Sequence, residues 1–502
     1  MDTFQHILNG FHVALMPINL WYTFLGVFMG TIIGVLPGIG PAAGIGLLIP
    51  ITFGMDATSA LIMMAGIYYG AMYGGSTTSI LINTPGEASS VMTAIDGYQM
   101  ARNGRAGAAL AVSAIGSFIA GTTGIVALTL LSLPLAAFAL KFGPAEYFCL
   151  MVFAMAAVSS LTGKSIAKGI LSTLLGLMIA TIGIDLQSGQ PRYTLGVPEL
   201  QDGVGFIVAV VGLFAIGEVF STIEEYLKGK IEFVHIKGKL WLTREEWRRS
   251  VMPIIRGSII GFVKGVLPGA GATISTILSY TIEKRISKHP EEFGHGAIEG
   301  VAGPEAANNA ATCGAMVPLL TLGVPGSGAT AVLMGAFIMY GIQPGPMLFE
   351  KRPDLVWGLV DSMYIGNVML LILNLPLIGI FVRILYIPTG ILMALILAIC
   401  AIGVYSINGN PLEMFMALGF GVMGYVFRKI DIPLAPLVLS LVLGGIMEQS
   451  FRQAMTISGG NPVVFVKSTI CIVLLIAAVV LLMAPMFFSK MRALKAAPED
   501  DA

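Results

Sequence analysis

The stretch GVLPGIG at residues 34–40 returns as GVLPGAG at residues 265–271. Each copy lies in a strongly apolar segment and is followed, about fifty residues later, by a second Pro-Gly pair, at residues 85–86 and 325–326. Proline removes a backbone donor and glycine permits a chain reversal, so these pairs break helices. Helix breakers at matched positions in two halves of a membrane protein point to a transport site near the bilayer midplane.

The composition places the chain in a membrane. Of its 502 residues, 56% are hydrophobic and only 11% are charged, whereas a soluble domain carries about 25% charged residues. We therefore predict an all-α polytopic membrane protein with roughly 12 transmembrane crossings, short and broken segments included. The first apolar run has no Lys or Arg before it, and we interpret it as a retained helix and not as a removed signal peptide. Apolar runs long enough to span a bilayer include residues 11–36, 108–133, 355–381 and 463–488.

Several kinds of function find no support in the sequence. The net charge is zero, with 28 basic and 28 acidic residues and no basic stripe, so nucleic acid is not an expected partner. The four cysteines lie in apolar segments without a CxxC motif and are expected to be buried thiols with neither disulfide nor metal. Neither HExxH nor GxSxG is present. We therefore expect no enzyme, no cofactor and no metal other than a coupling Na⁺.

The similarity between the two halves extends beyond the Pro-Gly pairs. SLPL at residues 132–135 resembles NLPL at residues 374–377, and the offset between matched positions stays near 231–250, as a duplication with small insertions produces. A hydrophilic stretch near the middle of the chain separates the halves. We predict a transmembrane repeat 1 at residues 11–221, a linker at 222–251, a transmembrane repeat 2 at 252–447, a C-terminal transmembrane helix at 463–488 and a tail at 489–502.

Loop charges indicate how these repeats are oriented, because Lys and Arg collect on the cytoplasmic side of a membrane. Basic loops of one half match nearly uncharged loops of the other half, as two inverted-topology repeats require. We predict an external N-terminus with an internal linker and C-terminus, although Lys351 and Arg352 depart from the pattern. The basic segments are the linker, residues 284–288, residues 428–429 and the tail, and the nearly uncharged ones are the N-terminus and residues 54–58 and 186–203.

Polar residues cluster around the second Pro-Gly pair of each half, where lipid offers no hydrogen-bond partner. A helix that unwinds and restarts there presents free N–H groups and a partial positive charge, which suit a carboxylate, while the carbonyls of the preceding half-helix suit Na⁺. The candidate substrate-binding residues are Ser76, Thr77, Thr78, Ser79, Asn83, Thr84, Pro85, Gly86, Asn308, Asn309, Pro325, Gly326, Ser327 and Thr330. The predicted helix breaks or hairpin tips are Pro37, Gly38, Gly40, Pro268, Gly269 and Gly271.

Other roles stay open for residues near the breaks. Gly, Ser and Thr in membrane helices also mediate close packing. Glu87 and Glu305 are ionisable residues beside the breaks and are candidates for ion coupling. Each could equally cap a half-helix or lie at the membrane interface. Tyr68, Tyr69 and Tyr73 are interpreted as packing residues.

These motifs resemble the large membrane subunit of the tripartite tricarboxylate transporters, the TctA family. The resemblance covers nearly the whole chain and implies a bacterial inner-membrane permease that works with a small four-helix membrane subunit (TctB-like) and a periplasmic solute-binding protein (TctC-like). It also implies that the binding protein delivers a carboxylate, which the large subunit imports using a Na⁺ or proton gradient and not ATP. Family members carry citrate and other tricarboxylates, but also dicarboxylates and aromatic carboxylates. The resemblance rests on residues 34–41, 70–87, 183–203, 265–273 and 304–330.

The motifs and the resemblance together predict symport by alternating access around a site built from both repeats, with an elevator-like movement expected by analogy with other inverted-repeat carriers. Two other classes stay open at this point. A self-sufficient carboxylate carrier would need no binding protein. A membrane-embedded enzyme would need an intramembrane cluster of His and acids or a nucleophile–base pair. A channel fits less well, because repeated broken helices with polar surroundings suit a carrier that encloses its cargo.

Overall fold

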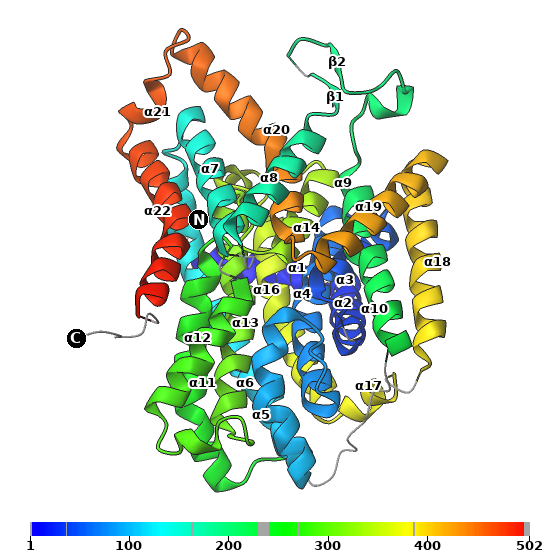
Figure 1. Cartoon of the computed structure of the whole chain (residues 1–502), viewed down its shortest axis with the longest axis vertical. Coiled ribbons are helices and arrows are strands. Elements are labelled where there is room, and N and C mark those ends of the chain that lie inside the picture. The colour runs from blue at the N-terminus through cyan, green and yellow to red at the C-terminus, as the bar shows by residue number, and fades with distance from the viewer. Residues whose placement is uncertain are drawn as a thin grey trace, which may run out of the picture. The chain divides into compact units, whose positions relative to one another are not determined.

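The computed structural model describes residues 3–36, 38–161, 165–185, 187–228, 240–269, 271–384 and 387–495. Helices make up almost all of these ranges (Figure 1), and the β-ribbon found in them pairs β1 (Gly183–Ile184) with β2 (Pro191–Arg192). The predicted all-α polytopic membrane fold is therefore confirmed. Pro37, residues 229–239 of the predicted linker and residues 496–502 of the predicted tail lie outside the described residues.

The chain packs into two compact units, and each draws on both halves of the sequence. Unit 1 comprises Met1–Leu140 and Gly205–Val426, and unit 2 comprises Lys141–Val204 and Phe427–Ala502. The helices of unit 1 are α1 (Thr3–Ala14), α2 (Pro17–Val35), α3 (Pro41–Leu48), α4 (Ala57–Ile82), α5 (Val91–Met100), α6 (Ala106–Ala139), α9 (Phe206–Val210), α10 (Gly217–Lys228), α11 (Arg244–Val266), α12 (Gly271–Ile286), α13 (Glu299–Leu322), α14 (Gly328–Met339), α15 (Pro346–Lys351), α16 (Pro353–Asn374), α17 (Ile378–Ile384), α18 (Thr389–Asn408) and most of α19 (Pro411–Lys429). Unit 2 contains the end of α19 together with α7 (Pro144–Leu161), α8 (Ile166–Ala180), α20 (Leu434–Ile457), α21 (Val464–Lys467) and α22 (Thr469–Lys495).

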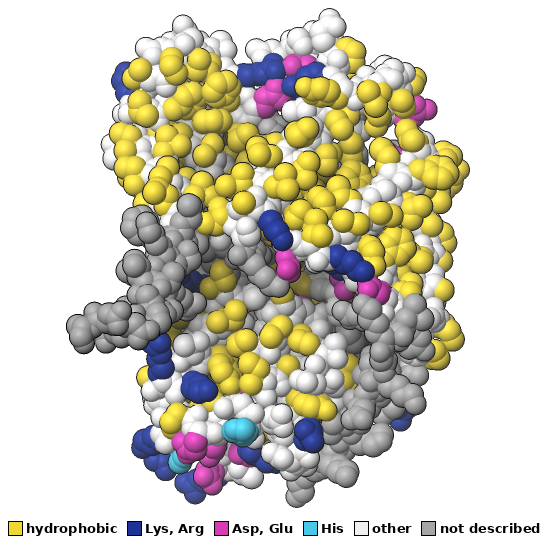
Figure 2. Space-filling view, viewed as in Figure 1, with side chains coloured by type: hydrophobic (Ala, Val, Ile, Leu, Met, Phe, Trp, Pro, Cys, Tyr) yellow, Lys and Arg dark blue, Asp and Glu magenta, His cyan; other side chains and the backbone are white. Residues whose placement is uncertain are grey.

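Many of the helices are apolar enough for a bilayer. Figure 2 shows hydrophobic side chains over much of the visible face, with many acidic and basic side chains gathered at its lower end. Within the described ranges, 6 helical segments are long and apolar enough to cross a membrane: Pro17–Val35, Ala88–Ala139, Phe206–Glu224, Pro353–Asn374, Gly390–Asn408 and Leu434–Ile457. Shorter apolar helices cover Pro41–Thr52, Pro144–Ser160, Ile166–Ala180, Gly328–Met339 and Thr469–Met483. The predicted number of crossings stays a prediction.

The long helices α4 and α13 form the centre of unit 1 and are buried along nearly their whole lengths. Each packs on a partner helix through glycines placed at every fourth residue. A Cβ added to Gly30 of α2 would lie 2.5 Å from the carbonyl oxygen of Ile67, and one added to Gly261 of α11 would lie 2.3 Å from that of Ala307. The backbones meet with no room for a methyl group, which is the close packing that small residues allow in membrane helices. The glycines are residues 26, 30 and 34 of α2 and residues 257, 261 and 265 of α11.

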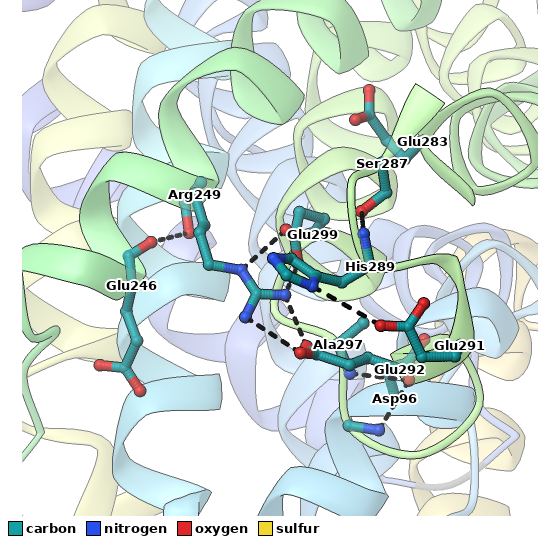
Figure 3. A network of polar contacts seen from close by, with 12 residues as sticks. Asp96, Glu246, Arg249, Glu283, Ser287, His289, Glu291, Glu292, Ala297 and Glu299 are labelled. Carbon is teal, nitrogen blue, oxygen red and sulfur yellow. Dashed lines mark hydrogen bonds and ion pairs between the residues drawn. The ribbon is translucent and has the colours of Figure 1, made fainter. Parts of the chain in front are cut away.

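At one end of unit 1, polar contacts join α5, α11 and α13 to the loop that precedes α13. Arg249 of α11 donates to Glu299 Oε2 at 2.8 Å and to Glu292 Oε2 at 2.5 Å, and Figure 3 shows its guanidinium between the two acids. The Asp96 carboxylate accepts hydrogen bonds from three backbone N–H groups of residues 294–297, at 2.8 to 3.0 Å. Glu292, Glu299 and Asp96 are therefore held by arginine or by fixed backbone donors.

In unit 2, ion pairs join the β-ribbon to α20. Arg452 donates to Asp185 Oδ2 at 2.8 Å and to Glu448 Oε1 at 2.5 Å, and Arg192 donates to Glu448 Oε1 at 2.9 Å. The hydrogen bond from Arg452, together with backbone N–H groups of the loop, holds the pKa of Asp185 well below its usual range. The ribbon is thus fixed to the end of a long helix by alternating charges.

Candidate transport site

Each of the two central helices ends in a left-handed residue and resumes after a Pro-Gly pair. α4 ends at Asn83, with φ 54°, and α13 ends at Gly323, with φ 67°. After the Pro-Gly pair, the chain restarts at Glu87 with φ −151° and ψ 167°, and at Ser327 with φ −152° and ψ 170°. The two breaks, defined as residues 83–90 and 323–330, therefore begin and end with matching backbone angles.

Both restarts are capped in the same way but differ in charge. Ser327 Oγ accepts a hydrogen bond from the N–H of Thr330 at 3.2 Å, and Thr330 Oγ1 accepts one from the N–H of Ser327 at 2.8 Å. Glu87 and Ser90 form the equivalent reciprocal pair at the start of η2 (Ala88–Ser90), which leads into α5. A carboxylate thus already occupies the positive end of the first restart, whereas a neutral hydroxyl caps the 12-residue α14.

Each break contacts the central helix of the other half. Asn308 of α13 donates through Nδ2 to Glu87 Oε1 at 3.1 Å, and the Tyr68 hydroxyl of α4 lies 3.2 Å from Ser327 Oγ. The structure therefore brings Glu87, Asn308 and Ser327 into one region. It adds Tyr68, which sequence reasoning assigned to packing. Tyr68 precedes Glu87 at the spacing by which Asn308 precedes Ser327, and this repeat of spacing is the signal that could have identified it.

The four hydroxyl residues at 76–79 are all buried within unit 1. Thr78 and Ser79 donate to the carbonyl of Gly75 in their own helix. Their hydroxyl groups are therefore used within the helix and not by a ligand. Ser76 instead donates to Glu305 Oε2 at 2.6 Å. The structure therefore links Ser76 to a buried carboxyl group. It does not bring this turn to the Asn308–Glu87 and Tyr68–Ser327 contacts, which we call the crossed contacts.

The other substrate-binding candidates differ in exposure and in partners. Asn309 donates through Nδ2 to Ser117 Oγ of α6 at 2.7 Å and to the carbonyl of Glu305 at 3.2 Å. Its side chain therefore faces α6 and the preceding turn of α13, and not the breaks. Around the breaks, Asn83 is exposed, Thr84 and Pro85 are partly exposed, and Gly86, Pro325 and Gly326 are buried.

The two Leu-Pro-Gly loops end α2 and α11 beside the breaks. Gly38 and Gly269 both have left-handed backbone, with φ 82° and 79°. The N–H of Gly269 donates to the carbonyl of Gly326 at 3.1 Å, and a Cβ added to Gly86 would lie 2.3 Å from the carbonyl oxygen of Gly34. Each loop therefore touches the break of its own half. Of the other hairpin candidates, Gly40 caps α3, Pro268 lies in the turn after α11, Gly271 starts α12, and Pro37 lies outside the described residues.

The two acidic candidates have different surroundings. Glu87 caps η2, which was one of the alternatives for it. Glu305 lies inside α13 and is fully buried, and its carboxylate accepts hydrogen bonds from hydroxyl groups alone among the described residues. It therefore neither caps a helix nor lies at an exposed surface.

Comparison with known proteins agrees with these motifs. Residues 20–439 match the model of the family described as the tripartite tricarboxylate transporter TctA family. The chain is 48% identical over 493 residues, 98% of each chain, to an Agrobacterium vitis protein described as an uncharacterized 52.8 kDa protein in the TAR-I ttuC' 3' region. It is also 48% identical over 233 residues to an uncharacterized protein in the TAR-II ttuC' 3' region of the same organism, which covers 46% of this chain and 96% of the relative. No solved structure matches the chain. The chain therefore belongs to the tripartite tricarboxylate transporter TctA family.

Proposed function

We propose that this chain is the large permease subunit of a three-component secondary transporter in the bacterial inner membrane. A periplasmic solute-binding protein delivers a tricarboxylate or a related carboxylate, and a small four-helix membrane subunit completes the complex. The chain carries the substrate inward by alternating access, driven by a Na⁺ or proton gradient, and acts as a carrier and not as an enzyme. Membership of a tripartite transporter family supports this role, and the apolar helices support the membrane location.

The crossed contacts carry this proposal. Asn308 reaches Glu87, and Tyr68 reaches Ser327, so each half of the chain supplies part of the surroundings of both breaks. A movement of one half against the other would therefore change the side-chain contacts of both breaks at the same time. A binding site that is rebuilt by such a movement is what alternating access requires.

We place the substrate carboxylate at the start of α14. The free N–H groups and the positive end of this helix favour an anion, and Ser327, Thr330 and the Tyr68 hydroxyl supply neutral hydrogen-bonding groups around it. The matching place in the first half suits an anion less well, because the Glu87 carboxylate stands there. The buried Oδ1 of Asn308 has no hydrogen-bond partner in the described part of the chain, so it is available to a hydroxyl group of the substrate.

The proposal includes two inverted repeats, at residues 11–221 and 252–447. The matched backbone angles of the two breaks and the matched glycine packing of α2 on α4 and α11 on α13 support a duplication. The loop charges support opposite orientations, with the N-terminus in the periplasm and the linker and C-terminus in the cytoplasm. Small tags at the two ends, probed for accessibility from each side of intact cells, test the orientation. Both tags on one side contradict it.

Uptake measurements test the proposed function. The substrate is first identified by thermal stabilisation of the binding protein with a panel of carboxylates, since a ligand at about 100 times its Kd adds about 2.7 kcal/mol. Uptake of that labelled carboxylate is then measured in cells with all three subunits and in cells that lack one of them. We expect uptake only with all three. Full uptake without the binding protein would instead support a self-sufficient carrier, and uptake that persists without this chain contradicts the proposal.

A further inference from the structure

A buried carboxyl group on α13, the helix that leads into the second break, contacts α4 and α5, the helices on either side of the first break. Glu305 of α13 is 0% exposed. Its Oε2 accepts hydrogen bonds from Ser76 at 2.6 Å, Ser113 at 3.1 Å and Ser117 at 3.4 Å, and its Oε1 accepts one from Thr93. These hydroxyls come from three helices, α4, α5 and α6, so the carboxyl joins four helices of unit 1.

Three other buried acids of unit 1 have an arginine or backbone N–H groups as partners. Glu299 and Glu283 each form an ion pair with an arginine of α11, at 2.8 and 2.5 Å. Asp96 accepts hydrogen bonds from the backbone N–H groups of residues 294–297 (Figure 3). Glu305 has neither kind of partner, because no ion pair and no backbone N–H bond within the described ranges reaches its carboxyl group.

Nearby titratable groups leave Glu305 without a compensating positive charge. Glu87 accepts a hydrogen bond from Asn308, which lies three residues after Glu305 on α13, so a second acid and not a cation lies near this part of the helix. Arg256 on the neighbouring α11 is already paired with Glu283 on α12. The elements packed against α13 carry titratable groups that include Tyr68, Tyr69 and Tyr73 of α4, Asp96 and Tyr98 of α5, Arg249, Arg256 and Lys264 of α11, Tyr280 and Glu283 of α12 and Glu87 of the first break, and α6 has none.

A shell made of hydroxyls satisfies a carboxyl group in both of its charge states. A backbone N–H group or an arginine can only donate, so it suits the carboxylate alone, whereas a Ser or Thr hydroxyl can donate or accept. When Glu305 is ionised, the four hydroxyls donate to it. When it is protonated, its O–H donates to one hydroxyl, which turns its own hydrogen away. Neither state leaves a buried polar group without a partner, which would be costly.

We propose that Glu305 binds and releases the proton that drives transport. The inference rests on the proposed function and deepens it, because that function left Na⁺ and the proton as alternative coupling ions. An ionisable residue inside a membrane bundle that can hold a proton is typical of proton relays in transporters. The carboxyl and hydroxyl oxygens lie within direct hydrogen-bond distance of one another, which is the arrangement that suits a proton.

The hydroxyl shell also gives a route from this proton to the substrate. Ser76 and Thr93 lie on α4 and α5, the two arms of the first break, and hydrogen bonds to an ionised group are about twice as strong as neutral ones. Protonation of Glu305 therefore loosens these arms. By the reciprocity of linked equilibria, a substrate that moves the arms changes the affinity for the proton. Asn309, which donates to Ser117, adds an amide group to the shell on the side of α6.

Infrared spectroscopy of the purified full-length chain tests the proton site without any substrate. Lowering the pH should produce the carbonyl band of a protonated carboxyl group. We expect Glu305→Gln to remove one component of this band and Glu305→Asp to keep it at a shifted position. The component from Asp361 of α16, which is also buried and whose carboxyl oxygens have no hydrogen-bond partner within the described residues, should stay in both variants. Asp96→Asn is the matched control, because Asp96 is a buried acid of the same unit whose Oδ1 accepts backbone N–H bonds and, in the described part of the chain, none from a Ser or Thr hydroxyl, and this variant should retain the band. A Glu305→Gln variant with the unaltered band overturns the inference.

A transport experiment separates this inference from the proposed function. With all three subunits present, exchange of labelled citrate for unlabelled citrate needs no net proton movement, whereas accumulation driven by a pH gradient does. We expect the ratio of accumulation to exchange to fall by about tenfold or more in Glu305→Gln. An unchanged ratio, or wild-type accumulation that follows a Na⁺ gradient alone, overturns the proton site. If the wild type shows no exchange and no accumulation of any carboxylate, the proposed function is wrong. The infrared result still decides the proton site in that case.

Discussion

The Tyr68 hydroxyl lies 3.2 Å from Ser327 Oγ, so a side chain of α4 reaches the residue that caps α14. The same relationship, with the halves exchanged, joins Asn308 to Glu87 at 3.1 Å. Because these contacts are made by side chains, a single substitution alters the surroundings of a break while its backbone hydrogen bonds stay in place.

We expect Tyr68→Phe to weaken the apparent affinity for the transported carboxylate by roughly 5- to 150-fold, corresponding to about 1–3 kcal/mol for a lost hydrogen-bonding group. The aromatic ring is kept, so the packing of α4 should change little. Uptake measured over a range of substrate concentrations gives the affinity. Tyr69→Phe is the control, since the Tyr69 hydroxyl lies against Gly366 of α16. An equal loss in both variants would show that the hydroxyl of Tyr68 has no special part in binding.

Asn83 gives a contrasting prediction. Its side chain is exposed and its backbone is left-handed, with φ 54°. Asn83→Gly should therefore keep uptake and stability, because glycine adopts this conformation freely, whereas Asn83→Ala should cost about 1 kcal/mol of stability. Thermal unfolding of the purified variants measures the difference. Loss of uptake in a stable Asn83→Gly variant would instead place the Asn83 side chain in the substrate site.

Gly261→Ala should destabilise the chain, because the added methyl group would lie 2.3 Å from the carbonyl oxygen of Ala307. Overpacking of this kind costs about 1–3 kcal/mol or more. The matched control is Gly419→Ala in α19, where an added Cβ meets nothing within 4 Å. That change should stabilise its helix by about 0.5–1 kcal/mol. Melting temperatures that shift in the same direction for both variants would contradict the close packing of α11 on α13.

Acidification should release the loop that carries the β-ribbon. The pKa of Asp185 is lowered in the folded chain by the hydrogen bond from Arg452, so its stabilising effect is complete above the unfolded pKa of about 3.9. This effect is lost as the pH falls below about 4 and toward the folded pKa. The protection of residues 187–203 against hydrogen exchange, after correction for the slower intrinsic exchange at acid pH, should therefore fall in this acid range. In Arg452→Gln, exchange should already be faster at neutral pH and should respond less to acid; a response as large as that of the wild type would sink this account.

The sequence predicted the helix breaks because Pro and Gly act on the local backbone wherever they stand. The surroundings of Glu305 could not be predicted in the same way. Its four hydroxyl partners lie 188 to 229 residues away along the chain, and only Ser76 belongs to a motif identified from the sequence. Only the packing of α4, α5 and α6 on α13 brings them together. A charged residue beside a break was visible in the sequence, but its charge environment depends on the fold.

The grouping into two units shows another limit of sequence reasoning. A similarity between halves identifies related segments, but it does not say which segments pack together. In unit 2, α8 from the first half lies against α20 from the second, and a Cβ added to Gly176 would lie 2.2 Å from the carbonyl oxygen of Leu437. The repeat boundaries inferred from sequence and the compact units of the fold therefore divide the chain in different ways.

The glycine contacts between α2 and α4 have a mechanical consequence. With no space for a methyl group at Gly30, a force on one of these helices is passed directly to the other. The break after α4 therefore lies at the end of a tightly packed helix pair, and we expect the Leu-Pro-Gly loop at the end of α2 to move together with it. The same holds for α11 and α13 at Gly261. We therefore expect the two Pro-Gly pairs of one half to move together.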